Sequence, residues 1–355
     1  MVDFEIKTKQ LIDSLKGICA SYGLGNDGNE FKIITQVFLY KFLNDKFAFE
    51  LKKINKDVAN AGVKWEEAYI SLSDNDKDML RFELGAKTAF LNSEHLISTL
   101  FNRQNESDFA KLFDDTLRDI AKQNNDIFAV KTDGGTKITL FEQNGLSNFI
   151  SDESKRDSFC RAIINKLADF SFEQIFKEKF DFFATIFEYL IKDYNKDSGG
   201  KYAEYYTPHA VAKIMASIMV KGDVKNVSCY DPSAGSGTLL MNIAHAIGED
   251  NCTIYSQDIS QKSSNLLRLN LILNNLVHSI SNIIQGNTML HPYFKDGNNL
   301  KKFDYIVSNP PFKMDFSDFR DDLDTKENKD RFFAGIPKIP AKKLESMAIY
   351  SLFLQ

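Results

Sequence analysis

The chain has 355 residues, more than one compact domain usually contains, so we expect two domains with separate cores. Its composition, 43% hydrophobic and 26% charged, is typical of globular proteins and excludes a disordered or collagen-like chain. No apolar run is long enough to span a membrane and the acidic start does not resemble a signal peptide, so we expect a cytoplasmic protein. The formal net charge of −5 means that nucleic-acid binding would need a local basic patch or a basic partner.

The cysteines indicate a reducing compartment. They lie far apart and form no C-x-x-C pair, which argues against a zinc site and against a disulfide framework. We therefore expect no metal centre and four buried thiols: Cys19, Cys160, Cys229 and Cys252.

The first half of the chain is predicted to be mainly helical. In "NEFKIITQVFLYKFLNDKFAFELKK" (29–53) apolar residues recur at the spacing of a helix face, and "FNRQNESDFAKLFDDTLRDIAKQ" (101–123) repeats the pattern. The exception is "IFAVKTDGGTKITLFE" (127–142), where two β-prone runs flank Asp-Gly-Gly, which predicts a hairpin or a tight loop. We expect a helical N-terminal domain over residues 1–167.

From Phe180 onward, helical and β-prone stretches alternate. This alternation predicts crossover units and a mostly parallel sheet, in which ligands bind beyond the carboxyl ends of the strands. We expect this second, α/β domain over residues 168–355. The predicted strands are 226–232, 252–258, 281–287 and 303–312, and the predicted helices are 180–196, 209–220, 236–248 and 263–276.

Polar residues follow the first three predicted strands. The loop "DPSAGSG" (231–237) has two glycines that permit positive φ, but it lacks the third glycine of the dinucleotide fingerprint and is weak evidence alone. Asp231 could meet a cationic group on a ligand. Asp258 could accept hydrogen bonds from ribose hydroxyls, or could simply cap the following helix. Asn287 is predicted to face the same edge.

The fourth strand ends in "NPPF" (309–312). Pro310 and Pro311 donate no backbone N–H and have fixed φ, so the strand must stop there. Asn309 and the Pro310 carbonyl could accept both hydrogens of an NH₂ group, and Phe312 could stack on the flat group that bears it. The alternative is a rigid turn without a ligand.

These motifs resemble those of a known family. In the order "DPSAGSG", "QD", "GNT" and "NPPF", they look like the amino-group S-adenosylmethionine-dependent DNA methyltransferases. Together with "KYAEYYTPHAVAKIM" (201–215) and a helical N-terminal domain, they resemble the modification (methylation, M) subunit of type I restriction-modification systems. The resemblance extends over nearly the whole chain and implies a Rossmann-like methyltransferase domain with a mostly parallel sheet.

The resemblance also implies site residues. The residues implied to bind S-adenosyl-L-methionine are Tyr206, Thr207, Pro208, Asp231, Ser233, Gly235, Gly237, Thr238, Asp258 and Asn287. Those implied to hold the target base are Asn309, Pro310, Pro311 and Phe312. The sequence departs from the family pattern at Asn287, where related enzymes commonly have an acidic residue.

The implied activity is methylation of adenine N6 on a base flipped out of double-stranded DNA. The implied partners are a specificity (S) subunit, a second M subunit and a restriction (R) subunit, and no membrane is involved. The resemblance implies that the N-terminal domain over residues 1–167 contacts these partners and the DNA. The chain stops within the helix expected after the fourth strand, so we expect the C-terminal part of the methyltransferase domain to be missing. Activity of this chain alone is therefore left open.

Three alternatives are weighed against this interpretation. A protein glutamine methyltransferase could place an amide NH₂ on the same acceptors, although such enzymes generally have tyrosine in place of Phe312. A truncated, noncatalytic interaction protein could retain the fold. A nicotinamide dehydrogenase is the least favoured because of the glycine spacing.

The acidic segment 315–333 is predicted to be a solvated loop.

Overall fold

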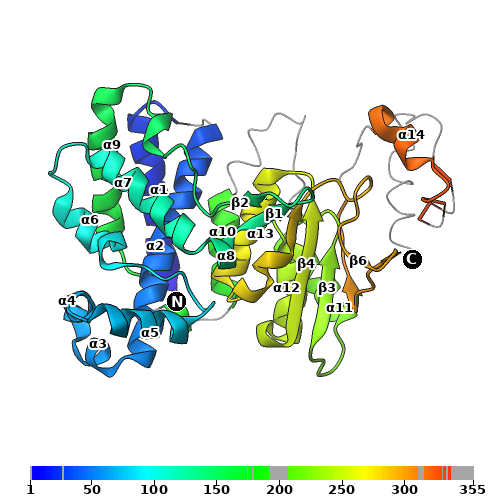
Figure 1. Cartoon of the computed structure of the whole chain (residues 1–355), viewed down its shortest axis with the longest axis horizontal. Helices are drawn as coiled ribbons and strands as arrows, with labels where there is room; N and C mark the ends of the chain where they lie inside the picture. Colours follow the sequence, from blue (N-terminus) through cyan, green and yellow to red (C-terminus); the bar gives the residue numbers. More distant parts are fainter. Residues whose placement is uncertain are drawn as a thin grey trace. The chain divides into compact units, whose positions relative to one another are not determined.

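A computed structural model describes residues 2–25, 28–173, 175–177, 180–191, 207–310, 316–329, 331–332 and 335–336. The chain divides into two compact units. The first contains Met1–Ala129 and Thr139–Ala203, and the second contains Val130–Ile138 and Glu204–Gln355. Among the described residues, the first unit contains helices and the second contains a sheet with helices (Figure 1).

The first unit is built around α2 (Gly28–Ile54), which corresponds to the helix predicted over 29–53. Helix α2 is buried on most sides, with its buried charges paired as Lys41–Asp45 and Lys46–Glu50, and α1 packs against both α2 and α9 (Figure 1). The helix predicted over 101–123 is interrupted after α6, since Asp108 adopts the left-handed conformation just before α7. The other helices are α1 (Val2–Ser21), α3 (Lys56–Asn60), α4 (Trp65–Ile70), α5 (Asp74–Leu84), α6 (Ile97–Arg103), α7 (Phe109–Gln123), α8 (Asn125–Phe128), α9 (Arg156–Ala168) and α10 (Phe180–Ile191).

The hairpin predicted within 127–142 is present, but it belongs to the second unit. Its strands β1 (Val130–Thr132) and β2 (Lys137–Ile138) are antiparallel, and β1 pairs in parallel with β5. The compact units therefore differ from the division expected at residue 167, because the hairpin lies with the sheet and α10 lies with the helices. Strand pairing is a non-local interaction, which the local hairpin pattern does not reveal.

In the described part of the second unit, six strands form a sheet in the order β2-β1-β5-β4-β3-β8, parallel except for β2. This confirms the predicted α/β class with a mainly parallel sheet. Its remaining strands are β3 (Val227–Asp231), β4 (Cys252–Asp258), β5 (Ile283–Gln285) and β8 (Tyr305–Ile306), and its helices are α11 (His209–Met219), α12 (Thr238–Ile247) and α13 (Gln261–Leu273). A separate hairpin joins β6 (Lys295–Asp296) to β7 (Asn299–Leu300).

The chain order reverses at β3. The strands that follow it, β4 and β5, lie on one side, whereas β8 lies on the other. In open α/β sheets a ligand crevice forms at such a reversal, beyond the carboxyl ends of the strands. The crevice expected here lies between the ends of β3 and β8.

Helices cover one face of this sheet and aromatic rings pack on the other. Helices α12 and α13 pack on the strands (Figure 1). The β4 side chains alternate, so that Ile254 and Ser256 are buried while Tyr255 points to the opposite face. There Tyr255 meets Phe303, which also stacks on Tyr230 with ring centroids 4.5 Å apart.

The prediction of a solvated loop over 315–333 is wrong for its described residues. They include α14 (Arg320–Leu323), and Phe316, Leu323 and Phe332 form a small apolar core with Met289. The apolar residues lie irregularly among aspartates and lysines, so no periodic pattern revealed this core.

Over the whole described part of the chain, none of the helices combines the length and the apolar character that crossing a bilayer requires.

Candidate functional site

The carboxyl ends of β3, β4, β5 and β8 bring the predicted site residues to one edge of the sheet. Asp231 ends β3 and Asp258 ends β4, while Asn287 and Asn309 follow β5 and β8 closely. Tyr206, Pro311 and Phe312 lie outside the residues that the structure describes. The remaining predicted residues all belong to the second unit.

The glycine loop needs both of its glycines. Gly235 has φ +54° and Gly237 has φ +81°, a region that other residues adopt only with strain. An added Cβ on Gly237 would also lie 2.2 Å from Leu267 Cδ1 on α13, whereas one on Gly235 would meet nothing within 4 Å. Gly237 therefore allows α12 to start at Thr238 in close contact with α13.

Asp231 is the buried carboxylate of the site. It is 1% exposed, and its Oδ1 accepts a 2.9 Å hydrogen bond from the Ser233 backbone N–H. Burial raises the pKa of Asp231 to about 7. The Ser233 and Ser308 hydroxyls share a hydrogen bond of 2.6 Å, which ties the glycine loop to the residue just before Asn309.

Asp258 has a structural role in the loop geometry. Its Oδ2 accepts a 2.8 Å hydrogen bond from the Gly235 N–H, and its Oδ1 accepts one of 2.8 Å from the Ser260 N–H. Ser260 in turn caps α13. Asp258 is only partly buried, and a carboxylate oxygen has two lone pairs, so these contacts are compatible with a further bond to a ribose hydroxyl.

Asn287 stabilises its own loop. Its Oδ1 accepts hydrogen bonds from the Met289 N–H at 3.0 Å and the Leu290 N–H at 3.3 Å. The next residue, Thr288, donates a 2.7 Å hydrogen bond to the Pro232 carbonyl. The loop after β5 is thereby attached to the loop after β3.

Asn309 and Thr207 lie together. Asn309 Nδ2 donates a 3.2 Å hydrogen bond to Thr207 Oγ1, and Pro208 is the residue that precedes α11. Asn309 and Pro310 are both partly exposed. This contact joins the "YTP" motif, through Thr207, to the "NPPF" motif, through Asn309.

Sequence analysis missed two polar residues that shape this edge. Ser308 joins the two loops as described above, and Gln257 is fully buried. Gln257 Nε2 donates to the His291 carbonyl at 2.7 Å, and its Oε1 accepts from the Tyr293 N–H at 3.1 Å. Position alone could have indicated Ser308, since it directly precedes Asn309 at a strand end. For Gln257, only its burial identifies it.

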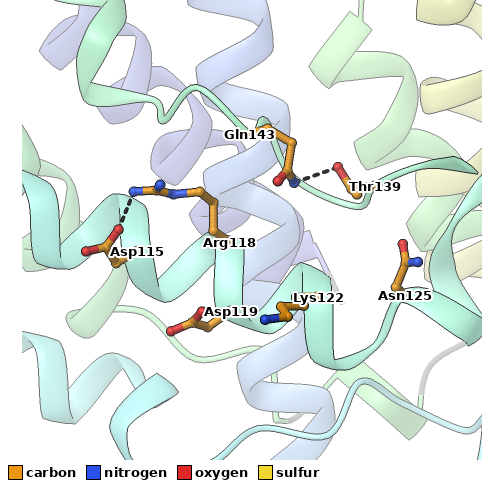
Figure 2. A pocket seen from close by; sticks show the side chains of 7 residues that line it. All are labelled: Asp115, Arg118, Asp119, Lys122, Asn125, Thr139 and Gln143. Atoms are coloured by element: carbon orange, nitrogen blue, oxygen red, sulfur yellow. Dashed lines mark hydrogen bonds and ion pairs between the residues drawn. The ribbon is translucent and has the colours of Figure 1, made fainter.

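The first unit also has a polar pocket, but its chemistry is less specific. Arg118 pairs with Asp115, and Gln143 Nε2 donates a 2.8 Å hydrogen bond to Thr139 (Figure 2). Its charges are of both signs and therefore favour no single class of ligand. The lining residues are Asp115, Arg118, Asp119, Lys122, Asn125, Thr139 and Gln143.

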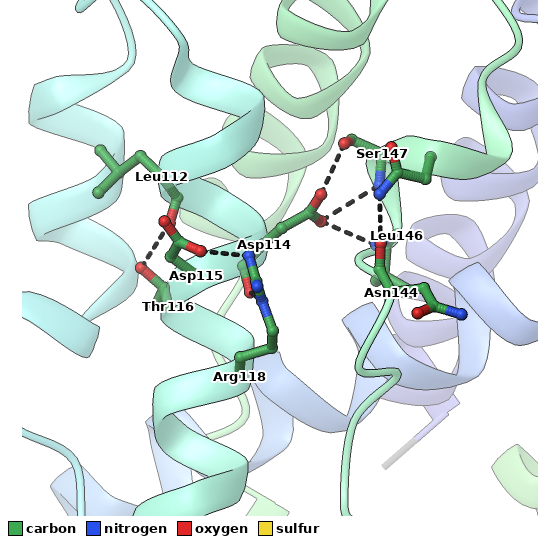
Figure 3. Close-up of polar contacts among 9 residues, drawn as sticks. Leu112, Asp114, Asp115, Thr116, Arg118, Asn144, Leu146 and Ser147 are labelled. Atoms are coloured by element: carbon green, nitrogen blue, oxygen red, sulfur yellow. Dashed lines mark hydrogen bonds and ion pairs between the residues drawn. The ribbon is translucent and has the colours of Figure 1, made fainter.

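Next to that pocket, Asp114 anchors a loop. Its carboxylate accepts hydrogen bonds from the Leu146 N–H at 2.8 Å, the Ser147 N–H at 3.2 Å and the Ser147 hydroxyl at 2.6 Å (Figure 3). Burial raises the pKa of Asp114. An added Cβ on Gly145 would lie 2.4 Å from Asp114 Oδ2, so the loop packs closely on the carboxylate. These contacts assign Asp114 a structural role.

Comparison with known proteins identifies the family of the C-terminal half of the chain. Residues 178–354 match the family described as N-6 DNA Methylase, and the chain belongs to that family over this range. A structure of a type I restriction-modification system methyltransferase subunit from Streptococcus thermophilus has a TM-score of 0.73 at 20% identity. The match covers 98% of this chain and 71% of the Streptococcus thermophilus chain, and it shows that the two share a fold.

The curated proteins that this chain resembles include type I restriction enzyme methylase subunits. The type I restriction enzyme MpnII methylase subunit of Mycoplasma pneumoniae is 25% identical over 333 residues, which is 88% of this chain and 58% of that protein. The MjaVIII methylase subunit of Methanocaldococcus jannaschii is 22% identical over 87% of this chain and 49% of its own length. The chain spans about half the length of the curated relatives it matches.

Proposed function

We propose that this chain acts as the modification subunit of a type I restriction-modification system and transfers a methyl group from S-adenosylmethionine to adenine N6 in DNA. The observation that carries this proposal is the convergence of two motifs. The Ser233–Ser308 contact ties the glycine loop to the residue before Asn309, so a cofactor beside the loop and a base beside Asn309 would be neighbours. The family and the relatives' names support the same activity.

The donor set fits S-adenosylmethionine. Asp231 provides a buried carboxylate for the ammonium group of the cofactor's amino-acid part, and the absence of a side chain at Gly235 leaves room for close backbone approach. Asp258, on the neighbouring strand, would accept hydrogen bonds from the ribose hydroxyls. The cofactor supplies an electrophilic methyl group at its sulfonium sulfur.

Asn309 would orient the acceptor nitrogen. Its Nδ2 is bound to Thr207, which fixes the amide plane and leaves Oδ1 to accept a hydrogen from the adenine amino group. The Pro310 carbonyl would accept the second hydrogen, with the nitrogen lone pair then directed at the methyl group. Attack by this nitrogen would form the N–CH₃ bond as the S–CH₃ bond breaks, with S-adenosylhomocysteine as the leaving group and the displaced proton released to solvent. Orientation supplies most of the rate enhancement in such a transfer.

The partners are part of the proposal. The net charge of −5 gives this chain little general attraction for DNA, which fits a subunit whose DNA recognition is delegated to a specificity subunit. We assign the helical first unit to contacts with that subunit, with DNA and with further M and R subunits. We place the complex in the cytoplasm.

Calorimetric titration of S-adenosylmethionine into the 355-residue chain tests the cofactor, with NADH as the control ligand. We expect saturable binding of S-adenosylmethionine and none of NADH. Transfer is then measured with radiolabelled cofactor, the specificity subunit and unmethylated DNA. If neither ligand binds to folded protein, the proposal is wrong and a noncatalytic interaction protein becomes the better interpretation.

A further inference from the structure

The turn of the β1–β2 hairpin lies at the same sheet edge as the candidate cofactor site. Strand β1 runs parallel to β5, so its carboxyl end meets the carboxyl ends of β5, β4 and β3 (Figure 1). The Asp133 N–H donates to the Gln285 carbonyl at 2.9 Å, and the Gly286 N–H donates to the Asp258 carbonyl at 2.8 Å. Asp133 therefore follows Gly286 and Asp258 in order along this edge.

The Asp133 carboxylate lies directly over Gly286. An added Cβ on Gly286 would lie 2.5 Å from Asp133 Oδ2 and 2.6 Å from its Cγ, so a larger residue would displace the carboxylate. Gly286 has no positive φ that would itself require glycine. The close approach of Asp133 is thus the structural reason for glycine at this position, and the carboxylate is also exposed to solvent.

The hairpin holds Asp133 firmly in place. The Thr132 N–H donates to the Thr136 carbonyl at 2.8 Å, and the Thr136 N–H donates to Thr132 Oγ1 at 3.0 Å. The buried Arg268 on α13 donates a 3.1 Å hydrogen bond to the Ile138 carbonyl. These bonds fix the backbone that carries Asp133, so less entropy is lost when its side chain binds a ligand.

The order of the strands assigns a position to each part of the cofactor. With the amino-acid part at Asp231 on β3 and the ribose at Asp258 on β4, the purine would extend over the ends of β5 and β1. Neighbouring strands are about 4.8 Å apart, so these groups are spaced as the successive parts of an extended nucleoside would be. At β5, the Asn287 Oδ1 already accepts two backbone hydrogen bonds. Asp133 is the next acceptor along the edge.

We propose that Asp133 accepts a hydrogen bond from the exocyclic amino group of the cofactor's purine and so selects a 6-amino purine over a 6-oxo purine. This inference rests on the proposed function and extends it. The N-terminal hairpin thereby contributes a specificity-determining residue to a site whose other residues come from the C-terminal half of the chain. A carboxylate has only acceptors, so it favours the amino group and repels a 6-oxo group.

The test measures dissociation constants of S-adenosylhomocysteine and its 6-oxo analogue, S-inosylhomocysteine. We expect the unaltered chain to prefer the 6-amino ligand by about tenfold or more, as is usual for a hydrogen bond to a charged group. Asp133→Ala should abolish the preference. Asp133→Asn should bind the 6-oxo ligand more tightly than the unaltered chain does, because its amide can donate to that oxygen. Asp296→Ala, which removes an exposed aspartate from the β6–β7 hairpin, serves as the charge-matched control and should leave the preference unchanged.

The outcomes separate the two proposals. If the unaltered chain binds the 6-amino ligand but Asp133→Ala keeps the full preference, Asp133 has no such role and the proposed function stands. If Asp133→Ala weakens both ligands equally, its role is structural and the inference is wrong. If the unaltered chain binds neither ligand, the proposed cofactor is wrong and this inference fails with it.

Discussion

The Asn309 side chain and the Thr207 hydroxyl are joined by a hydrogen bond of 3.2 Å across 102 residues of sequence. The contact fixes the orientation of the amide that is proposed to hold the target base. We expect Asn309→Ala to abolish methyl transfer, because the acceptor for the adenine amino group is lost. Its affinity for S-adenosylmethionine should remain nearly unchanged. Activity equal to that of the unaltered protein would contradict the assigned role.

Thr207 should affect the rate through Asn309. Thr207→Val removes the hydroxyl while keeping the shape, so the amide can rotate, and we expect kcat to fall about tenfold. Thr207→Ser keeps the hydroxyl and should retain most of the activity. Single-turnover transfer assays at saturating DNA measure both variants. Equal rates for the valine and serine variants would show that the hydrogen bond does not orient Asn309.

Gly237 and Gly235 provide a matched pair for the stability of the glycine loop. Gly235→Ala adds only backbone strain, so it should cost about 1 kcal/mol of unfolding free energy. Gly237→Ala adds an overlap with Leu267 and should cost about 2 kcal/mol more. Denaturant unfolding followed by circular dichroism measures both. Adding Leu267→Ala to Gly237→Ala should then cost less than Leu267→Ala costs alone, and strict additivity would contradict the overlap.

The pKa of Asp231, raised to about 7, predicts opposite pH effects on stability and binding. The folded protein holds this proton more tightly than the unfolded chain, so the ligand-free protein loses stability as pH rises from about 4 to about 7. A cationic cofactor favours the ionised carboxylate, so its affinity should rise with pH and level off above about 7. Calorimetric titrations of the cofactor between about pH 5.5 and about pH 8 measure this affinity.

Asp231→Asn is the control for that pH dependence. The amide nearly matches the carboxylate in shape but cannot ionise, so binding should be weaker and its dependence on pH should flatten. If the variant keeps the pH dependence of the unaltered protein, another group is responsible for it.

The Asp114 anchor should stabilise the first unit. Asp114→Ala leaves the Leu146 and Ser147 N–H groups without their acceptor, so we expect the free energy of unfolding to fall by about 3 kcal/mol. The only tryptophan, Trp65, lies in this unit and reports its unfolding by fluorescence. Asp115→Ala removes an exposed ion pair and should change the stability by less than about 1 kcal/mol. Equal losses in the two variants would contradict the anchoring role.

Local sequence was sufficient for the alternation of helices and strands and for the motifs at the strand ends. Apolar periodicity depends on neighbouring residues, and this is why α2 and the strands β3 and β4 lie where they were predicted. Glycine permits backbone conformations that other residues avoid and proline fixes φ, so the loops at 231–237 and 309–310 were recognisable without a structure.

Only the folded chain decided which of these elements share a site. Any β-prone segment can pair with an exposed strand, so the sequence could not show that residues 130–138 join β5 and bring Asp133 beside Gly286. The Ser233–Ser308 and Asn309–Thr207 contacts are likewise absent from any local pattern. They arise because parallel strands place distant carboxyl ends at one edge, where hydrogen bonds between side chains complete the site.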